Sequence, residues 1–147
     1  IETIHAATDL LAEAKLSPEL RNEALYYRAK AYTKQKADKK AMEDYRELAK
    51  DTRNPYGAEA KYQVAQSLYD AKEYAAAEKE LLNYIEQSTP HAYWLARSFV
   101  LLSDVYHATG KDLDARQYLL SLQQNYQGND DIESMIESRL SKLKVEN

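Results

Sequence analysis

The fold is decided by residues 55–90, which read PYGAEAKYQVAQSLYDAKEYAAAEKELLNYIEQSTP. This stretch begins and ends with proline and contains two segments rich in Ala, Leu and Tyr, which are separated at Lys72-Glu73. Apolar residues in each segment recur three or four positions apart, the spacing that places side chains on one face of an α-helix. Because the break between the segments is short, they are expected to form an antiparallel helical hairpin.

The same pattern occurs on both sides of this stretch. Pro18, Pro55 and Pro90 are 37 and 35 residues apart, and each opens a segment of similar composition. When the segments are aligned, a small residue is followed three positions later by Tyr or Leu, then by Ala, then by a bulky residue. The aligned positions are Ala29, Ala65 and Ser103; Tyr32, Leu68 and Tyr106; Ala41, Ala77 and Ala115; and Tyr45, Leu81 and Leu119. Small residues let two helix backbones approach each other. The six small residues of this list, five alanines and Ser103, are therefore expected to be buried between paired helices.

The two ends of the chain continue the pattern. Ala7, Leu11 and Ala14 precede Ala41, Tyr45 and Leu48 by 34 residues, so residues 1–15 are expected to be the second helix of an incomplete unit, within a fragment of a longer protein. At the other end, Asn129-Asp130-Asp131 precede a stripe of Ile132, Met135, Ile136, Leu140 and Leu143, which predicts a terminal capping helix. The pattern predicts about eight helices, at residues 1–15, 19–35, 38–50, 55–71, 74–87, 91–109, 112–126 and 130–144.

Local signals support these boundaries. Proline is favoured in the first turn of a helix, and Ser17, Asn54 and Thr89 are suited to N-capping. Gly110 suits a left-handed residue at the end of a helix, whereas Lys36 and Lys72 occupy the matching places in the earlier units.

These residues resemble the tetratricopeptide repeat family, whose members stack helical hairpins into a right-handed superhelix. The resemblance implies an all-α, right-handed solenoid of antiparallel helix hairpins over residues 1–147. Its parts would be 1–17 (second helix of a truncated repeat), 18–54, 55–89 and 90–127 (three repeats), and 128–147 (capping helix). Departures are the bulky Leu48, Tyr84 and Leu122 at a position that is usually small, and units longer than the usual 34 residues. The Ala-Glu-Ala-x-Tyr opening at 58–62 is similar to repeat modules of bacterial cell-envelope proteins, which implies a periplasmic or envelope location.

Composition excludes several classes of protein. Mean hydropathy is −0.73, and the 147 residues contain no apolar run long enough for a membrane span. Three Gly and three Pro are too few for the tight turns of a β-sandwich or barrel. No cysteine is present for disulfides or thiolate chemistry, and a net charge of −4 gives no reason to expect nucleic acid as a partner.

Signals for catalysis and cofactors are poor. The three glycines are isolated, so no phosphate-binding loop is present. His5, His91 and His107 fall in different units without the i, i+3 or i+4 spacing of a metal site, and a solvated or capping role is favoured for them. Acidic pairs such as Asp112/Asp114 stand where helices begin, where a carboxylate is favoured. No enzyme activity, metal or cofactor is predicted.

Charge is distributed unevenly between the units. Residues 19–50 carry nine basic and six acidic groups, and residues 55–90 carry three and six. Aromatic residues do not alternate with the lysines of 30–40, so a solvated hairpin turn is favoured over nucleic-acid or phosphate recognition.

A candidate binding surface follows from the resemblance, because the first helix of each tetratricopeptide unit lines the concave face. The inward positions would be Tyr26, Lys30 and Thr33; Tyr62, Gln66 and Tyr69; and Arg97, Asp104 and His107. Tyrosine offers a large contact area at low entropy cost. Packing of Tyr62 and Tyr69 against neighbouring units is the alternative interpretation. The pair of lysines and asparagines that holds a C-terminal carboxylate in some co-chaperones of this family is not present.

The leading hypothesis is a non-enzymatic scaffold that binds a segment of another protein in the groove of the solenoid. The alternative is a structural spacer or self-assembly segment of a longer repeat protein, with no ligand in the groove. Weak self-association through residues 1–15 is also expected, because an incomplete unit would leave Ile4, Leu10 and Leu11 partly uncovered.

Overall fold

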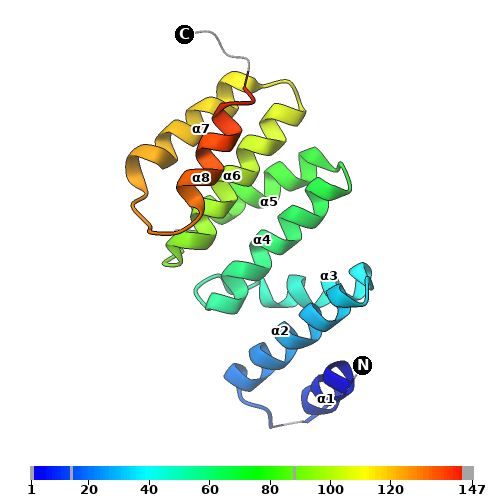
Figure 1. The fold of residues 1–147 in the computed structure, drawn as a ribbon. Coiled ribbons are helices and arrows are strands. Elements are labelled where there is room, and N and C mark those ends of the chain that lie inside the picture. The colour runs from blue at the N-terminus through cyan, green and yellow to red at the C-terminus, as the bar shows by residue number, and fades with distance from the viewer. Residues whose placement is uncertain (1, 14, 88, 144–147) are drawn as a thin grey trace. The chain divides into compact units, whose positions relative to one another are not determined.

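The structure is a computed structural model that describes residues 2–13, 15–87 and 89–143. The described chain is all-helical, with eight helices and no strand. The helices are α1 (Glu2–Leu11), α2 (Pro18–Lys34), α3 (Asp38–Leu48), α4 (Pro55–Asp70), α5 (Tyr74–Glu86), α6 (Ala92–Ala108), α7 (Asp112–Asn125) and α8 (Ile132–Leu140) (Figure 1).

The helices lie where the sequence pattern places them, and the predicted caps explain where several begin. The Ser17 hydroxyl accepts a hydrogen bond from the Leu20 amide at 3.2 Å, and Asn54 Oδ1 accepts one from the Tyr56 amide at 2.8 Å. α1 ends at Leu11, so it is shorter than the predicted helix of residues 1–15. The predictions for Ala14 and for residue 144 lie outside the described residues.

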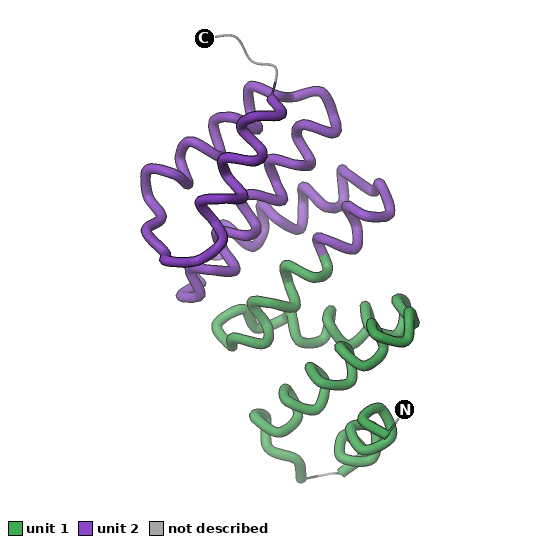
Figure 2. Tube along the Cα trace, viewed as in Figure 1, with its two compact units in different colours: residues 1–64 green, residues 65–147 purple. Residues whose placement is uncertain are grey.

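The chain separates into two compact units, residues 1–64 and residues 65–147, which Figure 2 shows in different colours. In the first unit, α2 packs against both α1 and α3. In the second unit, α6 packs against α5 and α7, and α8 packs against both α6 and α7. The boundary falls within α4, so this helix contributes residues to each unit.

The small residues that align in the repeats are all buried, as the pattern predicts. None of the six exposes more than 3% of its surface: Ala29, Ala41, Ala65, Ala77, Ser103 and Ala115. Tyr45, Leu81 and Leu119, which follow the second small residue of each unit, are buried as well.

The predicted apolar stripe of the last helix, α8, packs into the core of the second unit. Ile132 and Ile136 of α8 join a core with Ala96 and Val100 of α6 and with Leu119 and Leu122 of α7. Met135, Leu140 and Leu143 pack against this core. α8 thus packs against both α6 and α7 through two buried residues one helical turn apart (Figure 1).

Three hairpin turns share one backbone conformation. Lys36 and Lys72 have φ of 60°, and Gly110 has φ of 78°. The amide of the following residue donates to the carbonyl five residues earlier: Ala37 to Tyr32 and Glu73 to Leu68 at 2.9 Å, and Lys111 to Tyr106 at 2.7 Å. This is the Schellman arrangement that ends a helix at a left-handed residue. Lys36, Lys72 and Gly110 therefore have the same backbone conformation at equivalent turns, although this conformation is strained for lysine.

One glycine is required for close packing. A Cβ at Gly57, in the first turn of α4, would lie 1.8 Å from the carbonyl oxygen of Asp51 and 2.7 Å from that of Leu48. Backbone atoms cannot yield to such contacts. Gly57 therefore allows the start of α4 to approach the end of α3 within the first unit.

Replacement of Ala77 by leucine is expected to lower the free energy of unfolding by about 1–3 kcal/mol, because its site has no exposed surface and a larger side chain must displace a neighbouring helix. Urea denaturation monitored by circular dichroism measures the change. Ala76→Leu is the matched control, since Ala76 is exposed on the same helix. Equal stability of Ala77→Leu and Ala76→Leu would contradict the helix pairing.

The strain at the hairpin turns predicts opposite effects of glycine and alanine. Lys72→Gly is expected to raise the free energy of unfolding by about 0.5–1 kcal/mol, because relief of the left-handed strain outweighs the added entropy of the unfolded chain. Gly110→Ala is expected to lower it by about 1 kcal/mol. Lys79→Gly, in the interior of α5, serves as the control and should be destabilising. A destabilised Lys72→Gly would refute this account of the turns.

Candidate functional site

The nine predicted site residues divide between the two units. Tyr26, Lys30, Thr33 and Tyr62 belong to the first unit, and Gln66, Tyr69, Arg97, Asp104 and His107 belong to the second. Eight of the nine side chains reach solvent, and Tyr62 is buried with 5% of its surface exposed. The burial of Tyr62 fits the packing interpretation for that residue. Of the others, Tyr26 and Lys30 meet in the first unit, whereas Gln66 and His107 make only local contacts in the second.

In the first unit, Glu59 brings Tyr26 and Lys30 together. The Tyr26 hydroxyl donates to Glu59 Oε1 at 2.9 Å, and Lys30 Nζ lies 3.4 Å from Glu59 Oε2. Lys30 Nζ also lies 4.9 Å from the centre of the Tyr26 ring, in cation–π geometry. Glu59 extends from α4 and the other two side chains from α2, so the cluster also links these helices.

Protonation states in this cluster are well defined at neutral pH. Burial raises the pKa of Tyr26, so its hydroxyl remains a hydrogen-bond donor. The contact with Tyr26, and to a smaller extent the charge of Glu59, raises the pKa of Lys30, which therefore stays positively charged. The surface presents one neutral donor, one cation and one carboxylate in fixed positions.

Aromatic rings surround this group. Tyr26 lies 4.5 Å from Tyr56 and 5.3 Å from Tyr27, measured between ring centres. Tyr27 is 48% exposed. The Thr33 hydroxyl donates to the Ala29 carbonyl at 3.0 Å, one turn away on α2. The first-unit cluster therefore combines an exposed aromatic surface with a single lysine.

In the second unit, Asp104 and Tyr69 lie near α8. Asp104 of α6 pairs with Arg139 of α8 at 3.2 and 3.4 Å. Burial raises the pKa of Asp104, and the nearby Arg139 only partly opposes this rise. Burial, followed by the charge of Asp104, raises the pKa of Tyr69, whose ring lies 5.6 Å from that of Tyr74.

Arg97 is held by aromatic neighbours on its own helix. Its Nη1 donates to the Tyr93 hydroxyl at 2.9 Å, and its guanidinium lies 5.8 Å from the ring centres of both Tyr93 and Trp94. The Tyr93 hydroxyl donates to Asp131 at 3.0 Å, just before α8 begins. These contacts hold Arg97 in place at the side of α6 that meets α8.

The two remaining residues make local contacts. Gln66 Nε2 donates to Asp70 at 2.9 Å, and His107 Nδ1 lies 2.9 Å from Asp112 across the turn between α6 and α7. Neither contact joins them to the Asp104–Arg139 pair.

Sequence reasoning missed the partners that fix these side chains, namely Glu59 and Arg139, and it missed the Arg28–Asp44 pair. Asp44 is 4% exposed and accepts two hydrogen bonds from Arg28, at 2.8 and 2.7 Å. Arg28 also donates to Thr8 of α1 at 3.2 Å, so it links α1, α2 and α3. The available signal was the position of Asp44, three residues after the buried Ala41, because a charged residue on a core face requires a partner.

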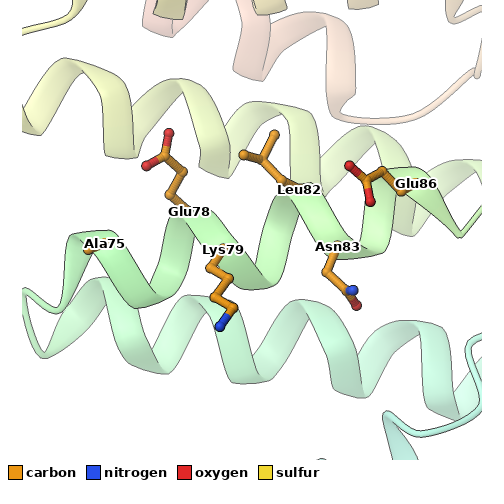
Figure 3. A pocket seen from close by; sticks show the side chains of 6 residues that line it. All are labelled: Ala75, Glu78, Lys79, Leu82, Asn83 and Glu86. Atoms are coloured by element: carbon orange, nitrogen blue, oxygen red, sulfur yellow. The ribbon is translucent and has the colours of Figure 1, made fainter.

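The surface of α5 carries a hollow. Figure 3 shows its six lining side chains, all from this helix: Ala75, Glu78, Lys79, Leu82, Asn83 and Glu86. Its volume is about 410 Å³. Burial, together with a hydrogen bond to Glu78, raises the pKa of Tyr106, so this carboxylate already has a structural partner. Its lining mixes charged, amide and apolar side chains.

Two further findings concern metals and membranes. The residues that the structure describes contain no group of three or more His, Cys, Asp or Glu side chains arranged to hold a metal ion. Among these same residues, no helix combines the length and apolarity needed to cross a membrane.

The raised pKa of Asp104 predicts a pH effect on stability. A carboxyl group with a higher pKa in the folded state binds more protons there than in the unfolded state, so stability falls as pH rises from the unfolded pKa through the folded one. Asp104→Asn should flatten this fall. Thermal unfolding between about pH 3.5 and pH 7 measures the difference, and Asp114→Asn, at an exposed carboxylate, is the control. Identical pH profiles for wild type and Asp104→Asn would contradict the prediction.

No protein-family model matches the chain, and no curated protein or solved structure is significantly similar to it. No family is therefore assigned, and the tetratricopeptide resemblance of the sequence stays a prediction.

Proposed function

We propose that the chain is a non-enzymatic protein-interaction scaffold of the tetratricopeptide type, a right-handed solenoid in which α2, α4 and α6 present a binding surface to a segment of another protein. The observation that carries the proposal is the solvent exposure of the predicted binding residues and the contacts that hold their side chains in place. Eight of the nine keep side-chain surface in solvent. Several of these eight are held by neighbouring side chains.

Preorganisation is the physical reason why such a surface suits binding. A side chain that is already immobilised loses little entropy when a partner arrives. Tyr26 and Lys30 are held by Glu59, and Arg97 is held by Tyr93. Tyrosine and arginine are also the residue types that contribute most to binding energy at protein interfaces.

The chemistry of the first-unit cluster indicates what it would bind. Tyr26, Tyr27 and Tyr56 offer ring faces and edges, and Lys30 is 48% exposed at its side chain. A partner segment with an apolar side chain and a nearby carboxylate or carbonyl would satisfy both features. The second-unit cluster offers charges of both signs, in Asp104 and Arg139.

The spacer function is the second candidate, and one observation favours it. Glu59 already pairs with Lys30, and Arg139 already pairs with Asp104, so these charges are balanced within the chain. A surface that satisfies its own charges is also what a structural segment without a ligand would need.

Site-specific photo-crosslinking separates the two functions. A photoreactive phenylalanine analogue at Thr33 or His107, both exposed on the first helices, is expected to crosslink the same partner protein in native lysate. The control positions are Lys79 on α5 and Gln117 on α7, which are equally exposed on the second helices. Crosslinks at the controls as strong as those at Thr33 and His107, or crosslinks only between copies of the chain, would contradict the scaffold and favour the spacer.

A further inference from the structure

A second surface lies in the first unit between α1 and α2, and it shares Tyr27 with the proposed binding face. Eight residues line a groove of about 360 Å³: Thr3, Ala6, Ala7, Leu10, Leu20, Glu23, Ala24 and Tyr27. The lining spans two turns on each helix. All of these side chains are apolar or weakly polar except Glu23.

The groove is unusually apolar for a surface. Leu20 is 47% exposed and Tyr27 is 48% exposed, and among the described residues the only other large hydrophobic side chain so exposed is Leu113. Two of these three therefore belong to one groove, next to the half-buried Leu10. Clustered exposed apolar residues indicate an interaction site, whereas scattered ones do not.

The second unit shows which kind of segment fits between two such helices. There the groove between α6 and α7 receives Ile132 and Ile136 of α8, four residues apart on one face. An amphipathic helix with apolar residues at this spacing covers two turns of its neighbours. The α1/α2 groove is lined over two turns of each helix, so an amphipathic helix with this spacing is the expected occupant.

Charge around the groove restricts the occupant further. Residues 2–24 contain five carboxylates, Glu2, Asp9, Glu13, Glu19 and Glu23, against Lys15 and Arg21. Apart from Glu23, which is exposed in the lining itself, these carboxylates lie on the same two helices or the turn between them. Within the part of the chain that the structure describes, none of the five forms an ion pair.

Two arginines of α2 pair with carboxylates of α3. Arg21 lies 3.7 Å from Glu47 of α3, and Arg28 pairs with Asp44 of α3 at 2.7 Å. The lining is therefore apolar apart from Glu23, and Glu23 together with Glu19, the neighbour of Leu20, is called the acidic edge of the groove. A second copy of the chain would bring one acidic edge against another, which opposes self-association at low salt.

We propose that the α1/α2 groove binds an amphipathic helix whose apolar stripe is flanked by lysine or arginine, supplied by a partner protein. The apolar stripe packs on Leu10, Leu20 and Tyr27, and the basic flanks face the acidic edge that includes Glu19 and Glu23. Recognition depends on both parts, because burial of the stripe provides contact area and the charges select the partner.

Two probe peptides of about 18 residues test the proposal. A peptide of this length is long enough to form a helix in water. Both carry the same stripe of leucine and alanine, and their flanking residues are lysine in one and glutamate in the other. Fluorescence anisotropy at low salt is expected to show the lysine peptide binding at least about 10-fold tighter, with the difference shrinking at about 0.5 M NaCl. Equal binding of both peptides, or no binding of either, would overturn the proposal.

Variants locate the binding. Leu20→Ala is expected to weaken binding of the lysine peptide about 5-fold or more through lost apolar contact, and Leu113→Ala, at the exposed leucine of α7, is the matched control. Glu19→Lys/Glu23→Lys should remove the preference for lysine, whereas Glu133→Lys/Glu137→Lys on α8 should keep it. Equal effects of variants and controls would overturn the site.

Sedimentation velocity tests whether a second copy of the chain, rather than a partner helix, occupies the groove. The wild-type chain is expected to stay monomeric without peptide at low salt. A dimer that Leu20→Ala dissociates would show that a second copy fills the groove, which would overturn the proposal. Because neither Thr33 nor His107 lines this groove, photo-crosslinking at these two positions can fail while peptide binding here succeeds.

Discussion

The close approach of paired helices at alanine-sized side chains is the constraint on which the rest of the structure depends. Ala29, Ala77 and Ala115 have no exposed surface, so each of these helices packs against its neighbour at a short side chain rather than at an adjustable long one. Once the helices are this close, their rotation is fixed as well. That rotation determines which residues of each first helix remain at the surface.

The hairpin turns extend this constraint along the chain. A left-handed residue at 36, 72 and 110 ends each helix in the same way, and the Schellman bond returns the chain at a reproducible angle. Two of the three positions are lysine rather than glycine. The geometry is thus imposed by helix packing strongly enough to tolerate about 1 kcal/mol of local strain at each lysine. The strained turns lower the free energy of unfolding, and the close packing of helices at the small side chains raises it.

The sequence was sufficient to predict the helices, because its strongest signals are local or periodic. Pro18 and Pro55 begin helices as expected, and the small residues aligned at intervals of 36 and 38 are buried. The contacts of the candidate binding surface were harder to predict from the sequence. The Tyr26–Glu59 and Asp104–Arg139 contacts join residues 33 and 35 apart on different helices, and they depend on helix rotation to within a few tens of degrees. Tyr62 illustrates the limit, since it shares a predicted face with Tyr69 but is buried. Charged partners on other helices leave no periodic trace in the sequence.

The two surfaces of the first unit differ in a way that follows from these same contacts. Three basic residues of α2 are paired with acceptors on other helices: Lys30 with Glu59, Arg21 with Glu47 and Arg28 with the buried Asp44. Arg28 must do so, because a carboxylate that is 4% exposed is stable only with a paired cation. The side of α2 that faces the α1 groove is consequently left with Glu23 and exposed apolar side chains. Arg28 of α2 is thus used to neutralise the buried Asp44 of α3. The side of α2 that lines the α1/α2 groove keeps an acidic and apolar surface.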